Sequence, residues 1–451
     1  MHPLLVLAIA IAVVFILIIR LKINAFIALV TAAMTVGLLS PNVKLALAMP
    51  KVAEIFGDVC GKIGIVIALA ALIGQCLMES GAADKITRVF VRLLGEKRAS
   101  LSLLSSGYIL SVPVFFDTVF YLLIPLARAM RVRTGRNYVL FVMAICAGAA
   151  VTHSMVPPTP GPLAMAATLK VDLGVMIVVG AIIGVPMSLA GWLFSVYRDR
   201  TLAVPFRETP GLSVAELVEL AGQEEKHLPG FVHSMLPIVA PVVFIASNTF
   251  ATAVGATGAV AGVAAFLGDP NFALLVSAAI SLHLLMKQKG HTLLELARTV
   301  EVAFMSAGLI ILITAAGGAF GGMLVEAGVG RTLGSMSKEY SIPVLLLSFL
   351  LAALIKLAQG SGTVSMITVS SIMAPLVVDS PPAFHPVYVA CAIGSGSLVG
   401  SWMNDSGFWV YKQMSGLTEV EALKTWTPLL TVLGITGYLM TQLAAVLAPL
   451  R

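Results

Sequence analysis

The residues most out of place in this apolar chain are Asn404, Asp405 and Ser406, within the stretch SGSLVGSWMNDSGFW. They stand where an apolar segment would otherwise run on through a bilayer. Inside a membrane, an amide, a carboxylate and a hydroxyl can interrupt a helix only where the freed backbone groups line a polar cavity. We therefore interpret Asn404, Asp405 and Ser406 as candidate solute-binding residues at a helix break.

A second carboxylate, Asp117, lies just past Pro113 in another apolar stretch. An ionised carboxylate at the bilayer centre costs roughly 2.5 to 3.5 kcal/mol on insertion scales, so its default interpretation is functional. Loss of hydration favours the protonated form, which suits a group that takes up and releases a proton. The structural alternative is a carboxyl group that hydrogen-bonds the backbone amides of the break.

His153 precedes a proline cluster at 157–162 that includes Pro158. Four prolines in six residues cannot continue a helix, because each lacks a backbone donor and clashes with the preceding turn. If this break packs against the break at Pro113, His153 faces Asp117. Histidine titrates near neutral pH, so the two side chains could form a proton relay. A histidine that only bridges two helices is the alternative.

A further break is indicated at 359–363, Gln-Gly-Ser-Gly-Thr. Helix N-termini at such breaks carry partial positive charge and favour an anion. The groups that could bind it here are the Ser361 and Thr363 hydroxyls and the Gly360 and Gly362 amides.

Lys356 is the one cation that the predicted loops do not accommodate. It could pair with a substrate carboxylate or neutralise Asp405. It could equally extend its ammonium group towards the membrane surface. The sequence leaves these possibilities open.

The composition indicates a polytopic membrane protein. Of 451 residues, 59% are hydrophobic and 11% charged, and the mean hydropathy is +1.00. Soluble domains have roughly half apolar residues, and a membrane span needs roughly 17 to 25. Apolar runs that approach or reach this length lie at 4–19, 26–39, 64–78, 176–196 and 428–447. The first run has no basic leader and no small-residue cleavage site, so we expect a retained span.

The net charge of +6 is modest, and its positive residues lie in short loops. This pattern orients a chain in the lipid bilayer and does not predict nucleic-acid binding. The four cysteines have neither metal nor disulfide spacing, so no metal or cofactor is expected.

Basic residues also predict the topology, because positive loops stay cytoplasmic. Arg20 and Lys22 join the first two spans, which places the N-terminus outside. Basic clusters before and after 101–127, the second including Arg128, put both ends of that stretch on the cytoplasmic face. With Pro113 near its middle, the stretch is predicted to be a re-entrant helical hairpin. We also expect a separate surface helix at 44–58 and an outer loop or partial insertion at 251–268.

An internal repeat organises the chain. Glu79-Ser-Gly resembles Glu326-Ala-Gly at an offset of 247 positions, and the same offset places Pro113 on Gly360 and Pro158 on Asp405. An odd number of spans between equivalent points makes the second copy inverted. The expected fold is an all-α polytopic membrane protein with two inverted-topology repeats, each holding a re-entrant helical hairpin and a broken transmembrane helix. The expected divisions are a first repeat at 1–197, a cytoplasmic linker at 198–230 and an inverted repeat at 231–451.

Motifs along nearly the whole chain carry a family resemblance: RLKINAFIAL at 20–29, Phe115-Phe-Asp117, Thr152-His153 with its prolines, GSGS at 394–397 and NDxGFW at 404–409. They resemble the gluconate:proton symporter (gluconate permease) family of the ion transporter superfamily. The resemblance implies proton-coupled uptake of gluconate or a related small hydroxy or sugar acid across the bacterial cytoplasmic (inner) membrane, by a homodimer. Thr159 and Trp402 stand where this family often carries histidine.

Together these observations predict a secondary active symporter whose breaks enclose a carboxylate-bearing solute. Asp117, with His153, would carry the proton. The predicted substrate-binding set is Pro113, His153, Pro158, Gly360, Ser361, Gly362, Thr363, Asn404, Asp405 and Ser406.

Three alternatives stay open. Sodium held at Ser361 and Thr363 could replace the proton, and separate sodium and pH gradients would distinguish the two. A passive channel would show no trans-stimulation. An intramembrane enzyme would change the solute chemically, but the sequence has no embedded Ser/His or paired-Asp motif.

Overall fold

The computed structural model describes residues 2–21, 23–95, 98–207, 228–329, 332, 343–378, 382–403 and 405–450, and over these residues it contains helices and connections without a strand. The first helices along the chain are α1 (Pro3–Phe15), a π-helix (Ile16–Arg20), α2 (Ala25–Leu39), α3 (Ala48–Glu79), α4 (Ala82–Leu94), α5 (Ala99–Leu110), α6 (Phe116–Thr134), α7 (Tyr138–Met155), α8 (Pro160–Thr168) and α9 (Leu173–Thr201). From residue 228 onwards follow α11 (Phe231–Ala253), α12 (Gly258–Leu267), α13 (Pro270–Lys289), α14 (Leu293–Glu326), α16 (Val344–Gln359), α17 (Gly362–Val378), α18 (Val387–Gly396), α19 (Ser406–Ser415) and α20 (Glu419–Leu447).

Local sequence explains where several helices begin. Asp172 accepts a hydrogen bond from the Val175 amide and caps α9, and Asp269 caps α13 in the same way. Thr292 and Thr418 each form a capping box with a glutamate three residues later, at the starts of α14 and α20. Such caps satisfy backbone donors that the first turn leaves without a partner.

Seven helices of the described chain are long and apolar enough to cross a membrane: Leu45–Glu79, Tyr138–Thr168, Leu173–Thr201, Phe231–Thr252, Pro270–Lys289, Leu293–Glu326 and Glu419–Leu447. Shorter apolar helices accompany them, α5, α16 and α17 among them. The prediction of an all-α protein with several membrane helices is confirmed.

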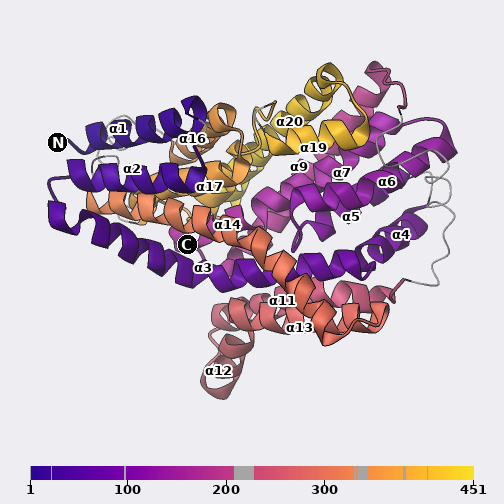
Figure 1. The fold of residues 1–451 in the computed structure, drawn as a ribbon, viewed down its shortest axis with the longest axis horizontal. Helices are drawn as coiled ribbons and strands as arrows, with labels where there is room; N and C mark the ends of the chain where they lie inside the picture. Colours follow the sequence, from indigo (N-terminus) through magenta and orange to yellow (C-terminus); the bar gives the residue numbers. More distant parts are fainter. Residues whose placement is uncertain are drawn as a thin grey trace.

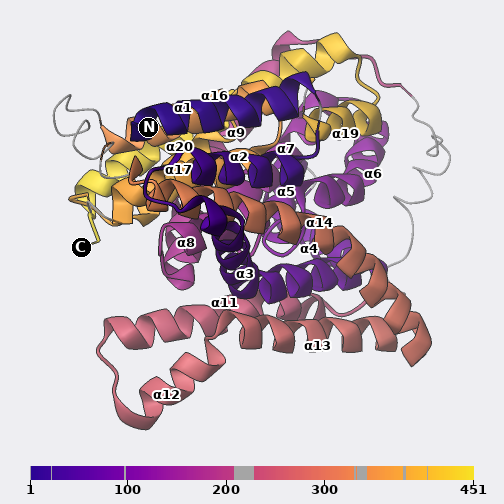
Figure 2. The same ribbon diagram turned by 60° about the vertical axis from the view of Figure 1, so that its left-hand side comes forward.

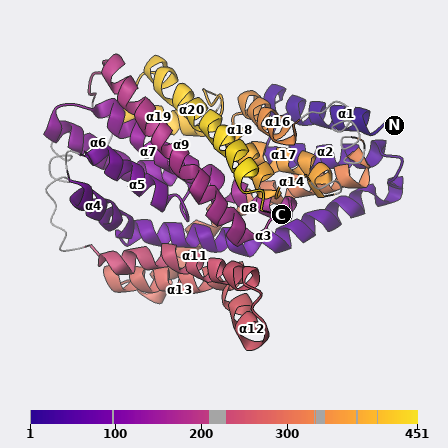
Figure 3. The same cartoon turned by 180° about the vertical axis from the view of Figure 1, so that it is seen from behind.

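The helices form two groups that meet at the centre of the molecule (Figure 1). On one side, α3 and α2 pack against α14, and α14 also contacts α17; on the other, α7 lies between α5 and α9. Seen from behind, α9 and α20 lie side by side (Figure 3). The pair α11 and α13 runs along one edge, and α12 projects from it (Figure 2).

α3 is one continuous helix, so the expectation of a separate surface helix at 44–58 is wrong. Ile55 and Val59 of α3 fill the space that Gly322 and Gly318 leave on α14. This packing joins segments far apart in the sequence and supports α3 as one continuous helix. Residues 258–267, expected as an outer loop or partial insertion, form α12, in which no residue is buried.

Four interruptions fall at the predicted places. Residues 111–115 separate α5 from α6, and 156–159 separate α7 from α8. In the second half, 360–361 separate α16 from α17 and 397–405 lie between α18 and α19. Gly360 has φ +90° and Gly400 φ +72°, in the left-handed region where glycine is favoured.

Candidate functional site

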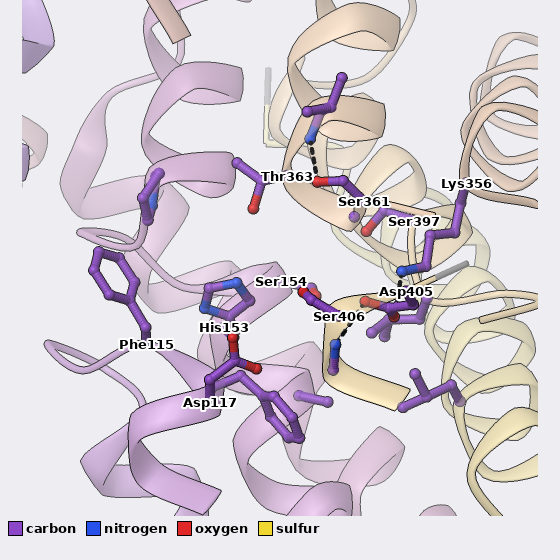
Figure 4. Close-up of a pocket in the computed structure, with 18 of the residues that line it drawn as sticks. Phe115, Asp117, His153, Ser154, Lys356, Ser361, Thr363, Ser397, Asp405 and Ser406 are labelled. Carbon is purple, nitrogen blue, oxygen red and sulfur yellow. Dashed lines mark hydrogen bonds and ion pairs between the residues drawn. The ribbon is translucent and has the colours of Figure 1, made fainter. Parts of the chain in front are cut away.

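A cavity of about 530 Å³ lies where the four interruptions meet. Its polar lining includes Asp117 of α6, His153 of α7, Lys356 of α16, Thr363 of α17 and Asp405 before α19, and Figure 4 shows these side chains around one space. Apolar residues of α14 and α20 complete the wall. The volume falls within the range of about 300 to 1,000 Å³ typical of small-molecule sites.

The α6 wall presents Asp117. This helix begins at Phe116, after the break at Pro113, so Asp117 lies in its first turn. A carboxylate there is stabilised by the positive end of the helix dipole. Figure 4 shows its carboxylate pointing towards the His153 ring.

The α7 wall presents His153. Every other residue from Tyr138 to Met155 is buried, and α7 borders the cavity with Ala150, His153 and Ser154. Its ring meets that of Phe115 edge to face, with centroids 6.4 Å apart. The buried Nδ1 of His153 has no hydrogen-bond partner in the described part of the chain. The structure therefore brings His153 beside Asp117 without a direct bond between them among the described contacts.

The opposite wall holds an ion pair. Lys356 Nζ lies 2.6 Å from Asp405 Oδ2 and donates to the Gly360 carbonyl at 2.5 Å. The two side chains are 4% and 12% exposed, so little solvent screens their attraction. Of the roles left open for Lys356, the structure shows pairing with Asp405, and its side chain still borders the cavity.

Asp405 is held from several directions. Its Oδ1 accepts the Gly407 amide at 3.0 Å, which caps α19, and its Oδ2 also accepts the Ser401 hydroxyl. Trp426 Nε1 of α20 donates to the Ser401 hydroxyl at 2.8 Å. These bonds fix the carboxylate in place beside Lys356.

The first turns of four helices border the cavity. Its lining includes Phe116 of α6, Pro160 of α8, Gly362 of α17 and Ser406 of α19, each the first residue of its helix. The leading amides of a helix lack internal acceptors, and its dipole is positive there. The site can therefore attract an anion although it contains two carboxylates.

The structure gathers most of the predicted site residues. Those lining the cavity are Asp117, His153, Ser361, Gly362, Thr363, Asp405 and Ser406. Gly360 contributes its carbonyl to Lys356. Pro113 and Pro158 instead border a separate small apolar cavity between α9, α11 and α13. Asn404 lies outside the described residues.

Sequence reasoning did not select Phe115, Ser154, Ser397 or Trp426, which also line the cavity. The GSGS motif at 394–397 was a signal for Ser397, and Phe115 stands in the motif that contains Asp117. Trp426 lies inside an ordinary apolar helix and gave no signal.

Helices interrupted around a polar central cavity, in a chain with several membrane-spanning helices, define a multi-pass membrane transport protein. Residues 2–447 match the family described as GntP family permease, and the chain belongs to this family. The family is one of permeases, and one relative, 31% identical over 436 residues, is an inner membrane permease of Escherichia coli.

The names of individual relatives are also those of permeases and transporters. The chain is 33% identical over 426 residues to a gluconate permease of Pseudomonas aeruginosa, covering 94% of this chain and 93% of that one. It is 31% identical over 433 residues to a low-affinity gluconate transporter of Escherichia coli, covering 95% of both. Among solved structures, the YdaH transporter of Alcanivorax borkumensis has a similar fold, with a TM-score of 0.64 and 12% identity over 90% of both chains.

Proposed function

We propose that this permease takes up gluconate or a related small hydroxy or sugar acid across the inner membrane, and that protons drive the uptake. The observation that carries the proposal is the convergence of four helix N-termini and a buried lysine on one cavity. Those groups suit a carboxylate, and the names of the relatives point to a sugar acid.

Asp117 and His153 are the proposed proton-carrying groups. Both border the cavity, and the buried His153 Nδ1 lacks a hydrogen-bond partner among the described residues, so this nitrogen could take up a proton. Their proximity supports a relay in which the proton reaches the solute-occupied cavity. Ser361, Thr363 and Ser406 would hydrogen-bond the solute hydroxyls.

Uptake of labelled gluconate into proteoliposomes tests both the solute and the coupling ion. A pH gradient, acidic on the uptake side, should drive accumulation, and a sodium gradient at equal pH should not. Accumulation with sodium alone would support the sodium alternative. Absence of gluconate uptake under either gradient would refute the proposed substrate.

The Asp117→Asn variant should lose proton-driven accumulation and keep some exchange of internal for external gluconate, because the amide cannot release a proton. Asp58→Asn is a matched control, since Asp58 is an exposed carboxylate of α3 away from the cavity. Full proton-driven uptake by Asp117→Asn would remove Asp117 from the coupling mechanism.

We further propose that the two halves, 1–197 and 231–451, are inverted repeats joined by a cytoplasmic linker, with the N-terminus outside and two chains forming a homodimer. The last residues of α3 and α14, Glu79 and Glu326, keep the offset of 247 positions that the sequence motifs show. In this proposal α5 with α6 and α16 with α17 are re-entrant hairpins. Labelling of single cysteines placed beside each terminus, from either side of the membrane, tests the orientation.

A further inference from the structure

We propose that Lys356 binds the carboxylate of the transported acid and that Asp405 competes with the acid for it, so that protonation of Asp405 releases Lys356 to the substrate. This inference rests on the proposed function and assigns the second wall of the same cavity. It makes the Lys356–Asp405 pair a second place where proton and substrate binding are linked.

The geometry offers one ammonium group to two carboxylates. Lys356 Nζ is in contact with Asp405 Oδ2 at 2.6 Å, and the same side chain borders the cavity. A substrate carboxylate approaching Lys356 therefore meets a cation whose charge Asp405 already balances. The bound anion would add negative charge beside Asp405 and Asp117 inside the protein, where like charges repel more strongly than in bulk water.

Charges around the cavity strengthen this argument. The titratable groups that face the pair are Asp117 from α6 and His153 from α7, and both interact electrostatically with Asp405 and Lys356. α14, α17, α20 and the segment that follows α18 contribute apolar, hydroxyl and indole groups to the lining. With His153 neutral, two carboxylates and one ammonium leave the cavity with a net negative charge before any acid enters. A proton taken up together with the acid keeps that charge unchanged.

A protonated Asp405 would still have hydrogen-bond partners. Its hydroxyl could donate to Ser401 Oγ, which Trp426 Nε1 holds at 2.8 Å, while Oδ1 continues to accept the Gly407 amide. The proton comes from solution and converts the carboxylate to a carboxylic acid, and Lys356 keeps its own proton throughout. The ammonium then exchanges one carboxylate partner for another without leaving a buried charge without a partner.

Binding of gluconate to the purified full-length protein, measured by calorimetry between about pH 5.5 and about pH 8.5, tests this competition. For the wild type we expect the affinity to fall as pH rises, by up to about tenfold per pH unit for one linked proton. Asp405→Asn imitates the protonated residue and frees Lys356. Its affinity should exceed that of the wild type at high pH and vary clearly less with pH.

Gluconamide provides a probe that needs no variant. It keeps the hydroxyl chain but has no carboxylate to compete for Lys356, so its affinity should vary clearly less with pH than that of gluconate. In the Asp405→Asn background, adding Lys356→Gln should lower gluconate affinity towards that of gluconamide. Lys51→Gln, which removes the lysine of more exposed ion pairs with Glu54 of α3 and Glu326 of α14, is the matched control and should behave as the wild type.

Two results would overturn the inference while the proposed function stands: an unchanged pH dependence in Asp405→Asn, or equal pH dependence for gluconate and gluconamide in the wild type. If the wild type bound no gluconate at any pH, the proposed function and this inference would both be wrong.

Discussion

Replacing the buried Arg128 by methionine would test what holds residues 202–207, which follow α9, against the other helices. Arg128 of α6 is fully buried. Its Nη2 donates to the Arg207 carbonyl at 2.6 Å and its Nη1 to the Tyr138 hydroxyl at 3.0 Å. The guanidinium carbon also lies 4.7 Å from the centre of the Phe206 ring. Arg128 Nη1 also donates to the Ser415 carbonyl at 3.4 Å, so one side chain joins α6, α7, α19 and residues 206–207.

The loss of stability expected for Arg128→Met can be worked from these contacts. Hydrogen bonds to charged groups contribute about 1.5 to 3 kcal/mol each, so the two shorter bonds, to Arg207 and Tyr138, together give about 3 to 6 kcal/mol. Methionine also removes the cost of holding a guanidinium group away from water, which offsets part of that loss. We therefore expect Arg128→Met to lower the free energy of unfolding by about 2 to 4 kcal/mol.

Thermal unfolding in detergent can be followed with a thiol-reactive dye, because Cys146 and Cys391 are free and buried until the chain opens. Arg128→Met should shift the transition down by several degrees. Arg128→Lys should lie between it and the wild type, because an ammonium group keeps the charge but not the planar donor geometry. Arg136→Gln, an exposed arginine beyond the same helix, should change stability by less than about 0.5 kcal/mol. An unshifted transition in Arg128→Met would refute the reasoning.

Two further predictions concern packing and surface charge. Gly148→Val should abolish the folded, monodisperse protein on size exclusion, because a side chain there meets the backbone carbonyl of Leu104, whereas Gly57→Val has open space and should purify normally. The Arg207–Glu421 pair, with contacts of 2.6 and 3.0 Å, should show a coupling of about 1 kcal/mol or less in a double-mutant cycle of thermal stability, because the Arg207 side chain is 36% exposed. A larger coupling that persists in high salt would contradict this estimate.

The helix breaks could be predicted because their causes are local. Proline lacks a donor wherever it stands, and Gly360 adopts a backbone conformation that favours glycine. The site residues could be predicted for a related reason. Polar groups deep in a membrane protein occur mainly where they line a cavity or bond the backbone groups that a helix break frees. Asp117 and His153, 36 positions apart, meet because both stand at such breaks.

Other features depend on contacts between distant segments. Lys356 had several possible partners, and only the packing of α16 beside the 397–405 break selected Asp405. The basic cluster that includes Arg128 predicts a loop there, but Arg128 lies inside α6 and is buried against oxygens from other segments. A hydrophobicity pattern reports the average environment of a segment and not the partner of one side chain.

The two walls of the cavity come from different halves of the chain, and on the proposed function this division links binding to movement. Asp117 and His153 belong to the first half, and Lys356 and Asp405 to the second. A solute that touches both walls binds tightly only in arrangements that hold the halves at the right separation. Because a ligand shifts a conformational equilibrium only by its difference in affinity between states, a solute bridging the walls favours those arrangements directly. A proton that changes the charge of either wall alters the same conformational equilibrium. Proton binding and acid binding can therefore affect each other through this equilibrium alone.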